Sequence, residues 1–171
     1  MYHVAHPPVK DASMAIKRIE VTQSALSTAE QANVFRLLID GSTWPSWSPI
    51  SSFRLAAESD DGAEGVGAVR VFKTGLLSSH EETVRIDAPN VFGYKLLTRA
   101  LHVRDYRAEV TLTPQSGGTS ITWAGSFRPL FPGSGWIWKR IIERLYRQFS
   151  EGLAAHADQL GSDDSPKDES D

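Results

Sequence analysis

From Val91 to Arg128 the chain reads VFGYKLLTRALHVRDYRAEVTLTPQSGGTSITWAGSFR, and apolar residues recur at every second position between its turns. This alternation already begins at residue 66 and predicts antiparallel strands with one buried face, because successive side chains of a strand point to opposite sides. Over residues 136–159 the period becomes helical. One side of that helix carries Trp138, Ile141, Ile142, Leu145, Phe149 and Leu153. A curved sheet closed by one amphipathic helix forms a container, so the pattern predicts that the protein holds an apolar molecule.

The other expected elements complete an α+β fold. Residues 18–25 alternate as a first strand, and a helix is expected over residues 28–40, where Ser27 and Glu30 form a capping-box pattern. The turn-rich residues 41–49 allow one short helical turn. Six further strands are expected at residues 52–58, 66–74, 80–87, 91–100, 105–114 and 119–128. The sequence therefore predicts a seven-stranded curved antiparallel sheet wrapped around a long C-terminal helix, with short helices after the first strand.

Length and composition indicate one folded domain. The 171 residues are 40% hydrophobic and 23% charged, which suits a single sizeable core. We expect a flexible lead-in at residues 1–16, the domain at residues 17–160 and a disordered acidic tail at residues 161–171. The chain contains no cysteine, which excludes disulfides, thiolate metal sites and thiol nucleophiles.

Charge and hydropathy argue against nucleic-acid binding, against a membrane-spanning helix and against secretion. The net charge is −3 and the tail alone carries −4, which leaves the rest of the chain at +1. A near-neutral body lacks the basic surface by which proteins bind nucleic acids. No apolar run approaches the roughly 18 residues of a membrane-spanning helix, and the first residues do not resemble a secretory signal. We therefore expect a cytoplasmic protein that binds no nucleic acid.

Strand parity predicts which side chains face the interior. In residues 80–87, the charged residues Glu81 and Arg85 are expected to face water. The alternating residues Glu82 and Val84 then face inward.

The same reasoning applied to every strand and to the helix gives the expected pocket. In residues 66–74, Val69 is preferred over Arg70 as an inward residue, because charged side chains are rarely buried. The expected pocket lining comprises Val69, Glu82, Val84, Tyr94, Leu96, Tyr106, Ala108, Val110, Trp123, Phe127, Trp138, Ile142 and Leu145.

Several short motifs follow one another in a distinctive order. They are WPSW at residues 44–47, GVGAVR at residues 65–70, Glu82-x-Val84 followed by Asp87-Ala88-Pro89, Phe92-Gly-Tyr94-Lys-Leu96, and Leu112-x-Pro114 with Gly118-Thr119 and Trp123. Their order and spacing over residues 17–160 resemble the START-like, Bet v 1-like superfamily, often labelled polyketide cyclase/dehydrase or SRPBCC. The resemblance implies a helix-grip fold with an apolar cavity between the sheet and the C-terminal helix. Members include lipid and hormone carriers and aromatase/cyclases, so the resemblance does not fix one activity.

Three polar residues of the expected lining could carry chemistry. Glu82 would place a carboxylate in an apolar interior, where desolvation favours the protonated form, and it could orient a ligand hydroxyl or act as a general acid. The alternative is a glutamate at the rim, bonded to a side chain of a neighbouring strand. Tyr94 and Tyr106 each offer a polar group in an apolar space, or serve as core residues whose hydroxyls bond the backbone or water.

Other motifs indicate neither a metal nor a cofactor. The five histidines are His3, His6, His80, His102 and His156. Their spacing lacks the convergence of a zinc or iron site. Gly65 and Gly67 open a strand rather than a helix, and no third glycine follows at the required offset, so they do not indicate nucleotide binding.

Three functions remain open from the sequence. The first is binding of a hydrophobic small molecule, such as a lipid, a polyketide-like compound or another aromatic ligand. The second is a polyketide cyclase/dehydratase that uses acid–base residues of the cavity, with Glu82, Tyr94 and Tyr106 as candidates. The third is a lipid-transfer or interaction protein that touches a membrane through residues 130–138, an unusually apolar loop. No oligomeric state is predicted.

Overall fold

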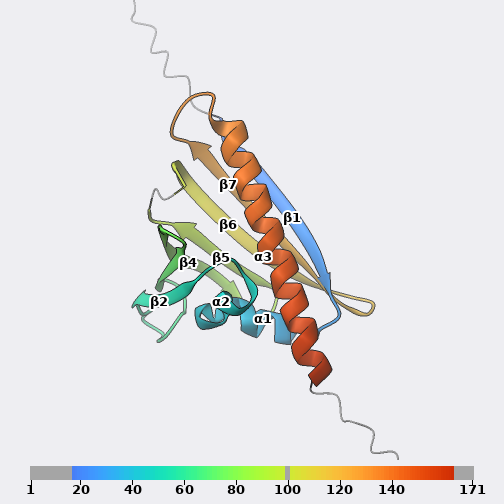
Figure 1. Cartoon of the computed structure of the whole chain (residues 1–171). Helices are drawn as coiled ribbons and strands as arrows, with labels where there is room; N and C mark the ends of the chain where they lie inside the picture. The colour runs from blue at the N-terminus through green and yellow to red at the C-terminus, as the bar shows by residue number, and fades with distance from the viewer. Residues whose placement is uncertain (1–16, 99–100, 164–171) are drawn as a thin grey trace, which may run out of the picture.

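Seven antiparallel strands wrap around one long helix in the computed structural model, which describes residues 17–98 and 101–163 (Figure 1). The strands are β1 (Ile19–Ser27), β2 (Ser52–Ala57), β3 (Val69–Thr74), β4 (Leu77–Asp87), β5 (Val91–Leu96), β6 (Val103–Gln115) and β7 (Gly118–Pro129). The helices are α1 (Gln31–Ile39), the 3-10 turn η1 (Gly41–Thr43), α2 (Trp44–Trp47) and α3 (Gly135–Asp163). The predicted helix-grip fold is confirmed.

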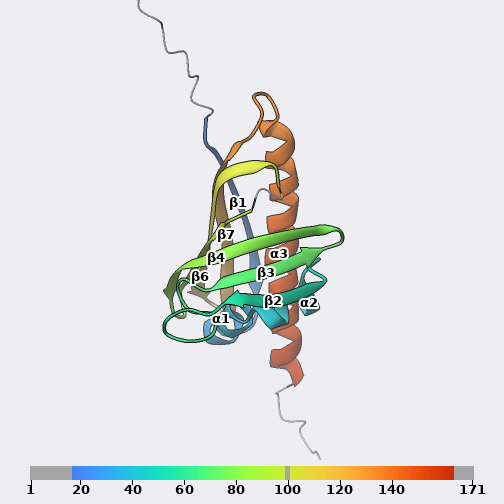
Figure 2. The ribbon, with the colours of Figure 1, turned by 90° about the vertical axis from the view of Figure 1, so that its left-hand side faces the viewer.

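The sheet is strongly curved. Its strand order is β1-β7-β6-β5-β4-β3-β2, so that each strand from β2 to β6 pairs with the next strand in sequence and β1 pairs with β7. Figure 2 shows that β1 and β7 run nearly along α3, whereas β2, β3 and β4 run across it. The strand direction rotates from one edge of the sheet to the other because each strand has a right-handed twist. The concave face that results encloses one side of α3.

The long helix α3 extends further than its apolar pattern indicated. It continues to Asp163, past the expected end at residue 159, so residues 161–163 of the expected tail are helical. The expected lead-in, residues 1–16, and residues 164–171 of the tail lie outside the described residues. None of the helices within the described part of the chain is both long and apolar enough to cross a membrane.

The capping box expected at Ser27 and Glu30 is not formed, and that prediction is wrong. Helix α1 begins at Gln31, and its N-cap Glu30 makes no side-chain cap hydrogen bond. Ser27 Oγ instead donates to the Asp158 carboxylate of α3 at 2.6 Å, and the backbone N–H of Thr28 donates to the same oxygen at 2.7 Å. These bonds tie the end of β1 to α3, a contact between distant residues that a local pattern does not report.

An aromatic cluster fills the core where α2, α3 and the sheet meet. Trp44 is fully buried at its centre. The ring centroids of Phe72, Trp123 and Phe149 lie 4.8, 5.6 and 5.5 Å from that of Trp44. Because these four rings come from α2, β3, β7 and α3, the cluster joins the short helix to the sheet and to the long helix.

A β-bulge in β4 interrupts the alternation of its two faces. Thr83 pairs with Tyr94 and Arg85 pairs with Gly93, which leaves Val84 without a partner on β5. An extra residue of this kind shifts the alternation by one position, so residues on its two sides do not share a common period of two. The faces assigned to β4 upstream of the bulge are therefore reversed relative to the sequence prediction.

Candidate ligand pocket

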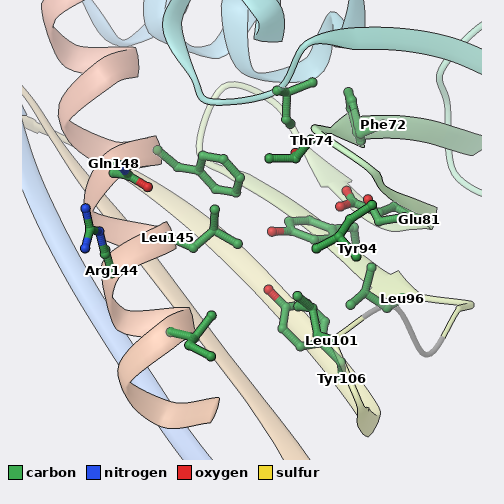
Figure 3. A pocket seen from close by; sticks show the side chains of 15 residues that line it. Phe72, Thr74, Glu81, Tyr94, Leu96, Leu101, Tyr106, Arg144, Leu145 and Gln148 are labelled. Carbon is green, nitrogen blue, oxygen red and sulfur yellow. The ribbon is translucent and has the colours of Figure 1, made fainter. Parts of the chain in front are cut away.

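A pocket of about 270 Å³ lies between the inner face of the sheet and α3 (Figure 3). It is lined by Ile50, Phe72, Thr74, Leu77, Ser79, Glu81, Tyr94, Leu96, Leu101, Tyr106, Ile141, Arg144, Leu145, Gln148 and Phe149. Most of the lining is apolar, and its ionisable side chains are Glu81, the two tyrosines and Arg144. An apolar pocket with a few polar groups has the usual composition of a small-molecule site.

Four of the residues predicted to line the pocket are found on its walls. They are Tyr94 and Leu96 from β5, Tyr106 from β6 and Leu145 from α3. Five others are buried core residues outside the lining, namely Ala108, Val110, Trp123, Phe127 and Ile142. Trp138 is partly buried and packs against the core. Side chains thus fill most of the space between sheet and helix, and a hollow is left in one part of it.

The remaining predicted residues lie outside the pocket, and the inward orientation assigned to Glu82 is wrong. Its Oε1 forms an ion pair with Nζ of Lys95 on β5, at 2.9 Å, which is the alternative arrangement of a glutamate bonded to a neighbouring strand. Val84 is exposed and Val69 is half-buried. Because of the bulge, an alternation counted across Val84 puts Glu82 on the inner face, where the structure has Glu81.

Glu81 is the acid that faces the pocket. Its Oε2 has no hydrogen-bond partner within the described residues, and Nη2 of Arg70 lies 3.6 Å from it. Burial raises the pKa of Glu81 to about 7, while the positive charge of Arg70 acts in the opposite direction. Glu81 can therefore exchange a proton near neutral pH.

Arg70 is a fully buried cation behind the pocket wall, so the prediction that Val69 and not Arg70 faces inward is wrong. Burial lowers the pKa of the guanidinium, and the nearby carboxylates raise it. Its guanidinium carbon lies 4.5 to 5.1 Å from the ring centroids of Phe92, Trp44 and Phe72. No described residue accepts a hydrogen bond from its guanidinium. Arg70 is stabilised instead by its contacts with the aromatic faces and by the negative charge of nearby carboxylates.

Two carboxylates share the charge of Arg70. Glu81 lies 3.6 Å and Glu64 lies 3.7 Å from guanidinium nitrogens, and the Glu64 carboxylate also accepts from the backbone N–H of Gly41. Arg70 and Glu81 are direct cross-strand partners in the β3–β4 hairpin. Opposite charges at paired positions of a hairpin are the sequence signal that could have located both residues.

Each of the two tyrosines that line the pocket is hydrogen-bonded to a buried aromatic side chain outside the lining. The hydroxyls of Tyr106 and Tyr146 are 2.7 Å apart, and Nε1–H of Trp123 donates to the Tyr94 hydroxyl at 3.1 Å. Burial raises the pKa of Tyr94 and Tyr106 well above the ordinary value of a phenol, so both stay protonated. The sequence analysis missed Tyr146, although it belongs to the buried side of α3.

The pocket reaches the surface between the β3–β4 hairpin and α3. Leu77 at the hairpin and Ile141 on the helix line the pocket and are also solvent-exposed. Arg144 stands on the same side of α3, so the entrance combines apolar side chains with one positive charge.

The described residues contain no group of three His, Cys, Asp or Glu side chains that could hold a metal ion. His80 lies within β4 and His102 in the turn before β6, and neither lines the pocket. His3 and His6 lie outside the described residues.

Comparisons with known proteins agree with this architecture. A START superfamily protein from Mycobacterium smegmatis is 14% identical, with a TM-score of 0.71 over 82% of this chain and 98% of the other. The structure of Ara h 8.0201 is 14% identical, with a TM-score of 0.66 over 82% of this chain and 98% of the other. The di-domain ARO/CYC StfQ from the steffimycin biosynthetic pathway is 10% identical, with a TM-score of 0.70 over 85% of this chain and 52% of the other.

At such identities these structures show a common fold alone. No curated protein is significantly similar to this chain. A sequence model of the family described as polyketide cyclase / dehydrase and lipid transport matches residues 18–158. Family and fold together suggest a ligand-binding or cyclase-like protein. The chain belongs to the polyketide cyclase / dehydrase and lipid transport family.

Proposed function

We propose that the protein binds a small hydrophobic molecule in the pocket between the sheet and α3. The observation that carries this proposal is the hollow of about 270 Å³, whose walls are mostly apolar and which opens at the surface. Burial of an apolar ligand there would supply the affinity, and Glu81 with the tyrosines would supply orientation.

Filling the pocket is expected to weaken ligand binding. Leu145→Trp adds an indole to the pocket wall, and we expect the affinity for the uncharged two-ring fluorescent probe 1-naphthylamine to fall by about tenfold or more. The matched control is Leu160→Trp, the same change at an exposed position of the same helix, which should bind like the wild type. Equal probe binding by all three proteins, or none by the wild type, would refute the proposal.

The second candidate function is a polyketide cyclase/dehydratase. Its supporting observation is Glu81, a carboxyl group on the pocket wall whose pKa of about 7 suits general acid–base catalysis near neutral pH. Glu81→Gln is then expected to lower turnover of a poly-β-ketone by about a hundredfold, as in other losses of a general acid or base. Glu82→Gln, on the outer face, should keep full turnover. Unchanged turnover in Glu81→Gln would remove this carboxyl from the mechanism.

The loop from β7 to α3 favours a role at a membrane, because large apolar side chains in residues 130–138 face solvent. Phe131 is 62% exposed and Trp136 is 70% exposed. Lys139 and Arg140 follow on the first turns of α3. Exposed aromatic residues beside basic residues are typical of surfaces that adsorb to anionic lipids.

Membrane contact through this loop can be measured with vesicles of phosphatidylcholine and phosphatidylglycerol. The double variant Phe131→Asp/Trp136→Asp is expected to co-sediment at least about threefold less than the wild type, because it removes the apolar contact and adds repulsion. Leu26→Asp, an equally exposed position at the end of β1, serves as control. Negligible sedimentation of the wild type would exclude this function.

A further inference from the structure

The pocket wall carries a carboxylate oxygen that accepts no hydrogen bond from the described residues and has only a longer ion-pair contact with Arg70. Glu81 lines the pocket and is 7% exposed, and its Oε2 has no hydrogen-bond partner among residues 17–98 and 101–163. A buried acceptor without a donor destabilises the structure, and a ligand that brings an N–H or O–H group would remove that penalty. The position of Glu81 therefore specifies a feature of the ligand.

We propose that the ligand is an uncharged compound of one or two rings, with a hydroxyl group that donates to Glu81, and that the pocket rejects carboxylate-bearing ligands. This inference rests on the proposed ligand-binding function and adds the chemical class of the ligand to it. Each part of the statement follows from a separate property of the pocket.

The neutral charge of the ligand follows from the ionic groups around the pocket. Glu81 already has a buried counter-charge, because Nη2 of Arg70 lies 3.6 Å from its Oε2. A ligand cation would be repelled by Arg70 behind Glu81 and by Arg144 at the entrance, and it would lose its own hydration in an apolar cavity. A ligand carboxylate next to ionised Glu81 would place two negative charges together, and neither group could donate a hydrogen bond to the other. A neutral donor satisfies the oxygen without either penalty.

The size of the ligand follows from the volume of the pocket. A cavity of about 150 Å³ holds one benzene molecule, so a pocket of about 270 Å³ holds roughly two fused rings. Long acyl chains exceed this space. Flat rings also suit the walls, since Phe72, Tyr94 and Tyr106 face the pocket (Figure 3). Phe149 of α3 also lines it.

The choice of a hydroxyl over other donors follows from Tyr94, which stands on the neighbouring strand. Glu81 pairs with Leu96, and Tyr94 is two residues along β5 on the same face, so Glu81 and Tyr94 are diagonal neighbours. Among the hydrogen bonds of the described residues, Tyr94 only accepts, from Trp123, and its own O–H is left to donate. A ligand hydroxyl both donates and accepts, so one such group can bond to Glu81 and Tyr94 together.

Three ligands of equal size and different polar groups test the proposal directly. Binding of naphthalene, 2-naphthol and 2-naphthoate is measured by displacement of the two-ring fluorescent probe 1-naphthylamine at pH 8, where Glu81, with its pKa of about 7, is mainly ionised. We expect 2-naphthol to bind about tenfold or more tightly than naphthalene, as hydrogen bonds to charged groups contribute in proteins. We expect 2-naphthoate to bind more weakly than naphthalene. This comparison uses only the wild-type protein and does not depend on the folding of a variant.

Adjacent glutamates provide the matched variants. Glu81→Gln removes the charged acceptor and should reduce the preference for 2-naphthol over naphthalene to about threefold or less. Glu82→Gln makes the same change one residue away, where the side chain pairs with Lys95 outside the pocket, and should keep the full preference.

The possible failures are distinguishable. Displacement of the probe by none of the three compounds contradicts the proposed ligand-binding function itself. Equal affinities for naphthalene and 2-naphthol overturn the hydroxyl assignment while ligand binding stands. Tightest binding of 2-naphthoate overturns the exclusion of carboxylates and assigns recognition to Arg144 at the entrance. Loss of the hydroxyl preference in both variants overturns the role given to Glu81.

Discussion

Arg70→Met is expected to lower the free energy of unfolding by about 3–5 kcal/mol at pH 8, the usual loss when one partner of a buried ion pair is removed. The change leaves Glu81 in the pocket wall and Glu64 behind it without their shared cation, 3.6 and 3.7 Å away in the wild type. It also removes the guanidinium from the faces of three aromatic rings. Urea denaturation followed by tryptophan fluorescence measures the difference.

The pH dependence separates the charge effect from the packing effect. The pKa of Glu81 is raised to about 7 from an ordinary 4.5, so ionisation of Glu81 opposes folding increasingly as pH rises from 4.5 to 7. Without Arg70 that pKa rises further, and the deficit of the variant should be larger at pH 8 than at pH 5. The double variant Arg70→Met/Glu81→Gln should regain part of the loss at pH 8. An equal deficit at both pH values, with no recovery in the double variant, would attribute the whole effect to packing.

Trp44→Ala is expected to destabilise the fold by about 3–5 kcal/mol, as is usual for removal of a large buried aromatic side chain. The indole contacts rings from β3, β7 and α3, so its loss opens a cavity at the junction of these elements. Its Nε1–H also donates to the carbonyl of Leu38 at 3.0 Å, and that carbonyl of α1 would lose a donor. Urea denaturation again gives the change.

The control for this variant is the same substitution at an exposed tryptophan. Trp136 is 70% exposed, and Trp136→Ala should change the free energy of unfolding by no more than about 0.5 kcal/mol. A loss below about 1 kcal/mol in Trp44→Ala would show that the aromatic cluster is not a main source of stability.

The fold could be predicted because local pattern and turns agree over most of the sheet. Apolar residues alternate in the sequences of β5, β6 and β7, and this pattern places Tyr94, Tyr106 and Trp123 on the inner face, where all three are buried. The helical stripe of α3 likewise identified the side that faces the sheet, including Leu145 and Ile142. Both features depend on residues that are close together in the sequence, so one sequence is enough to predict them.

The site could be predicted only in part, because its decisive features depend on partners distant in sequence. The bulge at Val84 arises from the register of β4 against β5. Because of it, Glu81 faces inward, whereas a regular alternation predicts Glu82. Residue preference argued against a buried Arg70, which is stabilised by two carboxylates and three rings that only the tertiary structure assembles.

Parity also cannot separate a pocket from a packed core. Val110 and Tyr106 share the inner face of β6, yet only Tyr106 borders the hollow. Which inward residues surround empty space depends on the volumes of the side chains opposite, and a single strand gives no information on these.

The unpaired residue of β4 has a consequence for comparing chains of different length. Deleting Val84 would join Thr83 directly to Arg85, whose partners Tyr94 and Gly93 are already consecutive, so both strand surfaces would keep their present residues. Deleting Glu82 would instead shift residues 77–81 by one position, so that each of their side chains would move to the opposite face of the sheet. An alignment with a chain that lacks this extra residue must therefore place its gap opposite Val84, or it will equate Glu81 of the pocket wall with Glu82 of the outer face.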